Sequence, residues 1–135
     1  GPPDYVREAL IDIGADRIDH GNRSMEDAGL VQVLRDTQTP LTNCPLSNLS
    51  LCVIDDLRDS PLKTQLEAGL LVTVNSDDPA YFGGYINQNY REIADALDLS
   101  DDQLIQLARN SFSGAFLSDA DKARHLSEID KALGI

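Results

Sequence analysis

The sequence has little positive charge, few cysteines and no long apolar segment. Of its 135 residues, 11 are Lys or Arg and 23 are Asp or Glu, so the formal net charge is −12. Because a nucleic-acid backbone binds basic surfaces, this charge argues against a nucleic-acid partner. No apolar run approaches the roughly 20 residues that a membrane span needs, so no membrane partner is expected. A metal ion, a cation or a neutral small molecule is the expected ligand.

Cysteine is also scarce, since Cys44 and Cys52 are the only two. Two cysteines are too few for a disulfide framework, and their spacing is not that of a zinc finger. A reducing, cytoplasmic location is therefore expected, with the nucleus as an addition in a eukaryote. The chain opens with GPPDYV, without an initiator methionine or a targeting segment. We expect that this opening lies inside a longer protein.

Apolar and turn-forming residues nevertheless alternate regularly along the chain. Residues 3–13 show helical spacing before Gly14, and Ser24 is expected to cap a second helix with an apolar stripe at Leu30, Val33 and Leu34. Short strands are predicted within residues 15–21, 40–45 and 70–75, and a helix opened by Ser60 and Pro61 precedes the third. Three more helices follow, at residues 87–97, 100–108 and 118–133, the second with a Ser100–Gln103 capping box.

Alternating short apolar strands and helices predict parallel βα units. Three strands are too few for a finished sheet of this kind, and a (β/α)₈ barrel typically takes about 250 residues. The sequence therefore predicts an α/β fold in which residues 1–135 form the C-terminal part of one TIM-barrel domain, with about three βα units plus terminal helices. A flavodoxin-like open sheet is the competing architecture.

Polar residues gather where each predicted strand ends, at His20, at residues 43–48 and at residues 75–78. The C-terminal strand ends of a barrel carry its active site, so these residues are candidates for chemistry. As a metal site the set is incomplete, because no H-x-H or H-E-x-x-H is present and the one other histidine, His125, is expected at the surface. Structural alternatives remain open: a hydrogen-bonded His20, a turn at Asp77 and Asp78, and a small buried Cys44.

Three motifs taken in order are more specific than any one of them. RIDHG, CPLSN and VNSDDPAYFGGY resemble the last three strand-end motifs of the adenosine/adenine deaminase family, and the tail NSFSGAFLSDADKARHL extends the likeness. Asp19 and the FGGY segment resemble the adenine deaminase branch. The resemblance implies zinc as cofactor and hydrolytic deamination of adenine to hypoxanthine and ammonia, within purine salvage.

The resemblance also assigns roles to individual residues. Asp77 would be a zinc ligand and a catalytic residue, and Asp78 would bind the purine, at N7, and contact the attacking water. His20 would orient and deprotonate that water. Ser47 and Asn48 would support the site beside His20, as would Asp19.

The chain departs from the family in what it lacks. Family members have an H-x-H on the first strand, a histidine on the fifth and a glutamate that donates a proton, and none of these is present. The fragment alone is therefore expected to be inactive. It is also expected to self-associate or to pair with the missing N-terminal part, because strand edges near Ile18 and Val72 and inward side chains such as Leu41, Leu71 and Val74 would be uncovered.

Two alternative functions follow from the same residues. One is deamination of adenosine or of an N6-substituted adenine, since residues that would contact a ribose lie outside this chain. The other is a catalytically inactive binding or scaffold module that keeps the barrel half.

Overall fold

A three-stranded parallel sheet forms the centre of the computed structural model, which describes residues 1–135. The strands are β1 (Ile18–Asp19), β2 (Leu41–Asn43) and β3 (Val72–Val74), and they lie in the order β1-β2-β3. Ile18 pairs with Leu41, and Leu41 pairs with Val72. This in-register parallel pairing brings all three C-terminal strand ends to one edge of the sheet.

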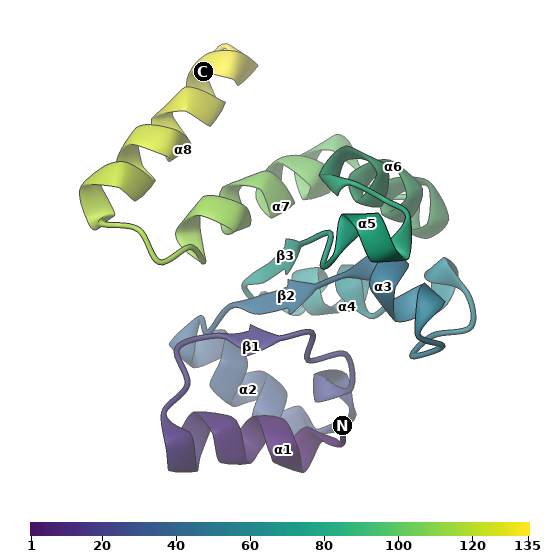
Figure 1. The fold of residues 1–135 in the computed structure, drawn as a ribbon. Coiled ribbons are helices and arrows are strands. Elements are labelled where there is room, and N and C mark those ends of the chain that lie inside the picture. Colours follow the sequence, from purple (N-terminus) through teal and green to yellow (C-terminus); the bar gives the residue numbers. More distant parts are fainter.

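Helical segments connect and flank the strands (Figure 1). Before β2 they are α1 (Pro3–Glu8), a π-helical turn (Ala9–Ile13), a 3₁₀ turn (Ser24–Glu26) and α2 (Ala28–Thr37). Between β2 and β3 they are α3 (Pro45–Ser50), a 3₁₀ turn (Leu57–Asp59) and α4 (Leu62–Glu67). After β3 they are α5 (Pro79–Phe82), α6 (Ile86–Leu97), α7 (Asp101–Ser113) and α8 (Asp119–Leu133).

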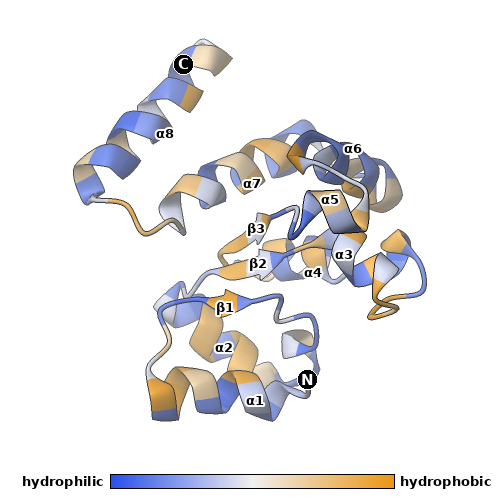
Figure 2. Cartoon of the chain, viewed as in Figure 1, coloured by the Kyte–Doolittle hydropathy of each residue, from blue (hydrophilic) through white to orange (hydrophobic).

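The hydrophobic core lies between one face of the sheet and the helices. Ile18, Leu41 and Val72 share this face and are almost completely buried. They pack in one cluster with side chains from α2, α4, α6 and α7, namely Leu30, Leu34, Leu62, Ile93 and Leu107. Figure 2 shows hydrophobic residues on the strands and on the neighbouring α2. Helix burial against a parallel sheet is thus the main source of stability.

The opposite face of the sheet is polar. Asp19, Thr42 and Thr73 occupy paired positions there, and the Thr42 hydroxyl donates to the Asp19 carboxylate across 3.0 Å. The expectation that Leu41 and Val74 lie uncovered on the inward face is therefore wrong, because both are buried beneath the helices. The alternation Val72-Thr73-Val74 shows that Val72 and Val74 share one face of the sheet. It does not show whether helices cover that face.

Most predicted helices are confirmed, with two local corrections. Ser24 does not cap α2; the cap is Asp27, whose carboxylate accepts from the Leu30 N–H across 3.0 Å. Ser24 instead begins a separate 3₁₀ turn. Two short helices that the sequence did not predict, α3 and α5, start directly after β2 and β3. The predicted capping box at Ser100 and Gln103 is present.

Helix α8 extends away from the sheet (Figure 1) and contributes no buried residue. It contacts α7 through an Arg109–Asp130 ion pair and through stacking of Phe112 on His125, whose ring centroids lie 4.6 Å apart. None of the helices has the length and apolar character to cross a membrane.

The position of Leu41 gives a stability prediction. Leu41→Ala should lower the free energy of unfolding by about 2–5 kcal/mol, because it opens a cavity in the centre of the core. Leu51→Ala is the matched control; its side chain is 55% exposed, so a change within about 0.5 kcal/mol is expected. Guanidinium unfolding followed by circular dichroism at one protein concentration measures both. Equal effects of the two substitutions would contradict the assignment of Leu41 to the helix-covered face.

Candidate active site

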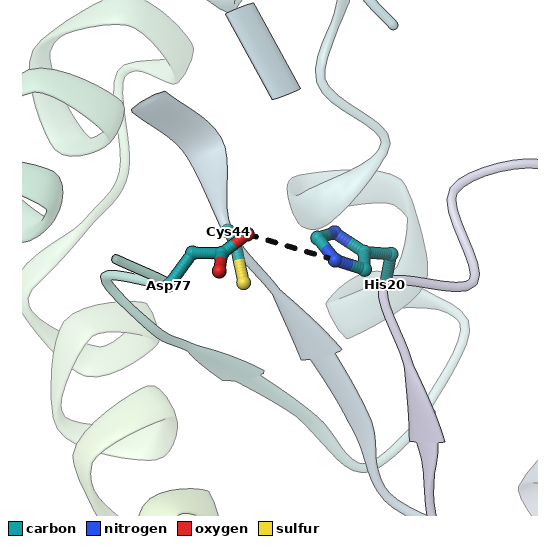
Figure 3. A group of neighbouring side chains, drawn as sticks. All are labelled: His20, Cys44 and Asp77. Atoms are coloured by element: carbon teal, nitrogen blue, oxygen red, sulfur yellow. Dashed lines mark ion pairs between the residues drawn. The ribbon is translucent and has the colours of Figure 1, made fainter. Parts of the chain in front are cut away.

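The ends of the three strands bring an imidazole, a thiol and a carboxylate together (Figure 3). His20 follows β1, Cys44 follows β2, and Asp77 lies three residues after β3. One potential ligand atom from each of these side chains lies within 4.8 Å of the other two. A polar cavity of about 310 Å³ opens onto all three. The predicted convergence of His20 and Asp77 is therefore present, and Cys44 joins them.

The backbone turns sharply at His20 to point its side chain into this cavity. His20 and Gly21 both have left-handed conformations, with φ of 66° and 67°. For a residue with a side chain this conformation costs on the order of 1–3 kcal/mol and persists only where surrounding contacts impose it. Here the His20 N–H donates to the Thr42 carbonyl across 2.9 Å, and the buried Gln65 amide donates to the Gly21 carbonyl across 3.2 Å. The strain is thus located at the one histidine of the site.

Asp77 is held by a serine from helix α3. It also has a left-handed backbone, with φ of 58°. The buried Ser47 hydroxyl donates to Asp77 Oδ2 across 2.7 Å, and His20 Nε2 lies 3.9 Å from the same oxygen. This hydrogen bond orients the carboxylate through one oxygen and leaves Oδ1 available for another ligand. Ser47 was expected beside His20; in the structure its hydroxyl contacts Asp77.

Asn48 contacts the other nitrogen of the His20 ring. Asn48 Oδ1 lies 3.1 Å from His20 Nδ1, and the Asn48 side chain is only 1% exposed. The two ring nitrogens of His20 thus face different partners, the Asn48 amide on one side and the Asp77 carboxylate on the other. A histidine held in this way presents a defined nitrogen to the cavity.

The two adjacent carboxylates diverge. Whereas Asp77 faces Ser47 and His20, Asp78 caps α5, its carboxylate accepting from the Tyr81 N–H across 3.1 Å. Adjacent like charges are tolerable here because each finds a different donor. The Asp78 side chain remains exposed, so its second oxygen can reach a ligand.

Asp19 lies beneath the site on the polar face of the sheet. Its carboxylate is 3.4 Å from the Arg17 guanidinium and accepts from the Thr42 hydroxyl. Asp19 does not touch His20 or Asp77 through a hydrogen bond; it adds negative charge below them. Its contact with Thr42 links it to the strand that also holds the His20 backbone.

Cys44 is buried beside the two charged groups. Its side chain is 5% exposed, and burial, assisted by the negative charges of Asp77 and Asp19, raises the pKa of the thiol to about 12. The thiol therefore stays protonated at neutral pH and points at the Thr42 carbonyl, 3.7 Å away. This environment agrees with the expectation that Cys44 is a small buried residue.

Apart from the Cys44 thiol, the site offers part of a zinc coordination sphere. Carboxylate oxygen is a normal zinc ligand, and Asp77 keeps one oxygen available beside the cavity. Catalytic zinc sites usually have three protein ligands and an open position. Asp77 can supply one of these, so the residues present fit a zinc ion whose further ligands come from elsewhere in a complete barrel.

The sequence did not reveal two residues that structure this site. Asn22 contacts the Asn48 amide, as does Asn43 from the expected polar group at residues 43–48, and Gln65 supports the His20–Gly21 turn from α4. An asparagine after a short strand is common in ordinary turns, so Asn22 carried no signal. The nearness of Gln65 depends on a crossover that brings residues 44 positions apart together.

The chain is similar to known proteins over almost its whole length. The chain matches the family described as adenosine deaminase over residues 1–132. It is 66% identical over 130 residues to the adenine deaminase of Sphingopyxis alaskensis, an alignment that covers 96% of this chain and 38% of that protein. The chain thus spans well under half the length of this relative.

The fold of the chain is also similar to that of solved structures. The crystal structure of the adenine deaminase from Arthrobacter aurescens superimposes with a TM-score of 0.95 at 47% identity, covering 100% of this chain and 41% of that one. An amidohydrolase from Burkhoderia ambifaria, solved with bound Zn, has a TM-score of 0.86 at 21% identity and covers 98% of this chain and 38% of its own. The predicted family resemblance and the predicted α/β barrel architecture are confirmed.

The environment of Cys44 predicts slow alkylation. With a pKa of about 12, only roughly 10⁻⁴ of this thiol is ionised at about pH 8, and the ionised fraction rises tenfold for each pH unit above that. Iodoacetamide should therefore modify the exposed Cys52 first, and modification of Cys44 should accelerate about tenfold per pH unit from about pH 7 to 10. Mass spectrometry of the two peptides gives both rates. Equally fast labelling of both cysteines near neutral pH would contradict this environment.

Proposed function

Since the chain belongs to the adenosine deaminase family, we propose that it contributes the last three βα units of a zinc-dependent adenine deaminase. The complete enzyme would hydrolyse adenine to hypoxanthine and ammonia, in purine salvage and in the cytoplasm. The observation that carries the proposal is the 66% identity over 96% of the chain to a protein named adenine deaminase. The joint presence of His20, Ser47 and Asp77 at one edge of the sheet supports it.

Each residue of the site has a role in this reaction. Asp77, whose Oδ2 accepts from the Ser47 hydroxyl, would hold the zinc ion. Zinc supplies a Lewis acid and lowers the pKa of a coordinated water toward neutrality. His20 accepts a proton from the attacking water through Nε2, the ring nitrogen that faces Asp77.

The substrate would lie above this edge of the sheet. Water adds at C6 of adenine, the C6–N bond breaks, and the amino group leaves as ammonia with the proton that the water has lost. Asp78 would contact the purine at N7 and also the attacking water, using the carboxylate oxygen that its N-cap bond to Tyr81 leaves available. The two adjacent carboxylates would therefore contact different ligands: Asp77 the metal ion and Asp78 the purine.

Substrate assays of the complete protein test the proposal. Ammonia release from adenine should exceed release from adenosine and from an N6-substituted adenine at equal concentrations. A preference for adenosine or for the N6-substituted base would select the alternative deaminase functions, and no turnover of any of them with zinc bound would favour a binding module. The isolated 135-residue chain is the control. It should be inactive and, by light scattering, larger than its monomer mass of 14.7 kDa, because β1 and β3 both end the sheet with unpaired edges.

Zinc content measured alongside activity separates the roles of the site residues. In the complete enzyme, Asp77→Ala should lose both zinc and activity. His20→Ala should keep zinc and lose roughly 10²–10⁴-fold in turnover, because it removes a general base. Asp78→Asn should also keep zinc while losing activity, because it changes a substrate contact. Loss of zinc on replacing His20 would show that His20 is a ligand and not the base.

A further inference from the structure

Three asparagine amides form a closed network behind His20. Asn48 Nδ2 donates to Asn22 Oδ1 across 3.2 Å and lies 3.4 Å from Asn43 Oδ1. Asn43 Nδ2 in turn lies 3.4 Å from Asn22 Oδ1. Asn43 and Asn48 are almost completely buried, whereas Asn22 is only partly covered. The network connects the loop after β1 with β2 and α3.

The direction of these hydrogen bonds determines which atom of Asn48 faces the histidine. Because its nitrogen donates to Asn22 and Asn43, the Asn48 oxygen is the atom 3.1 Å from His20 Nδ1. An amide oxygen accepts only, so Nδ1 must carry the ring proton. His20 Nε2 then keeps its lone pair, on the side of the ring that faces Asp77.

The opposite arrangement of the same three amides is also self-consistent. If all three were reversed, Asn48 would present its N–H to His20, and Nδ1 would have to accept. The neutral ring would then carry its proton on Nε2, and the lone pair would face away from the cavity. The choice between the two arrangements decides whether His20 can accept a proton from a water near Asp77.

We propose that Asn22 is a positioning residue that acts through Asn48 to keep the proton of His20 on Nδ1 and the lone pair on Nε2. Both other amides donate to Asn22 Oδ1, so an acceptor at position 22 keeps the Asn48 nitrogen turned away from His20. Asn22 also lies two residues after His20, beyond the left-handed pair formed by His20 and Gly21. The network therefore ties the orientation of the histidine to the turn that projects it.

This inference rests on the proposed function, in which His20 accepts a proton through Nε2. It adds a residue that touches neither substrate nor metal. Its effect on rate should match that of groups that orient a reacting side chain, for which replacement typically costs 10–100-fold.

Two substitutions of opposite hydrogen-bonding character test the role of Asn22. Asn22→Asp offers oxygens only, so it should still accept from Asn48 and Asn43 and preserve the Nδ1-protonated ring. Asn22→Leu has a similar size and no acceptor, so the ring should become a mixture of its two neutral forms. Because Asn22 is only partly covered, neither change opens a core cavity. Asn87→Leu, at an exposed position on α6, is the matched control and should change nothing.

Nitrogen-15 NMR of the histidine rings in the complete, zinc-loaded protein is the primary measurement. It is made at about pH 8.5, above the usual imidazole range. The unsubstituted protein and Asn22→Asp should show protonated Nδ1 and unprotonated Nε2 for His20, identified by its loss in His20→Ala. In Asn22→Leu, kcat should fall roughly 10–100-fold while KM and zinc content change less than about twofold.

The outcomes separate this inference from the proposed function. Unchanged ring protonation and kcat in Asn22→Leu would overturn the role of Asn22, as would an Asn22→Asp protein that behaves like Asn22→Leu. A ring protonated on Nε2 in the unsubstituted protein would also overturn it. If the protein deaminates no purine but its ring protonation responds to Asn22 as described, the proposed function fails and the positioning role stands.

Discussion

The parallel, in-register pairing of three very short strands is the constraint on which the rest of this structure depends. Because Ile18, Leu41 and Val72 lie side by side, the residues that follow each strand emerge at the same edge. The same pairing places these three side chains on the helix-covered face, so that the core and the site are positioned by one register. A shift of one residue in β2 would expose Leu41 and move Cys44 and Ser47 away from Asp77.

The site adds local strain to this scaffold. His20 and Asp77 are the two site residues with left-handed backbones, and both project into the polar cavity. Such conformations are rare for residues with side chains and need support from their surroundings. The support comes from buried polar groups, Gln65 behind the His20 turn and Ser47 beside Asp77. The core and its buried polar neighbours thus offset the cost of holding His20 and Asp77 in these conformations.

The carboxylates around the site have separate partners. With a net charge of −12, the chain nevertheless places only Asp77 against His20, while Asp78 caps a helix and Asp19 faces Arg17. The inner face of the sheet is therefore polar and internally paired rather than apolar. In a complete barrel, such a face suits a metal ion and a polar heterocycle better than a packed hydrophobic layer.

Much of the fold was readable from the sequence. Helical spacing, capping residues and β-branched runs predicted the order of helices and strands, because these are properties of neighbouring residues. The motifs around His20 and Asp77 marked the candidate site for the same reason: strand ends in a parallel fold share one edge. The cap of α2 was misassigned because Ser24 and Asp27 are both good capping residues, and only the path of the chain chooses between them.

Tertiary structure alone decided the facing of the strands and the contacts behind the site. The alternation Val72-Thr73-Val74 puts Val72 and Val74 on one face, but only the register with β2 and the packing of the helices show that this face is the covered one. The Asn22–Asn48 contact joins residues 26 positions apart, and the Gln65–Gly21 contact joins residues 44 apart. Hydrogen bonds of this kind depend on the packing of α3 and α4 against the loop after β1, so no local pattern of residues encodes them.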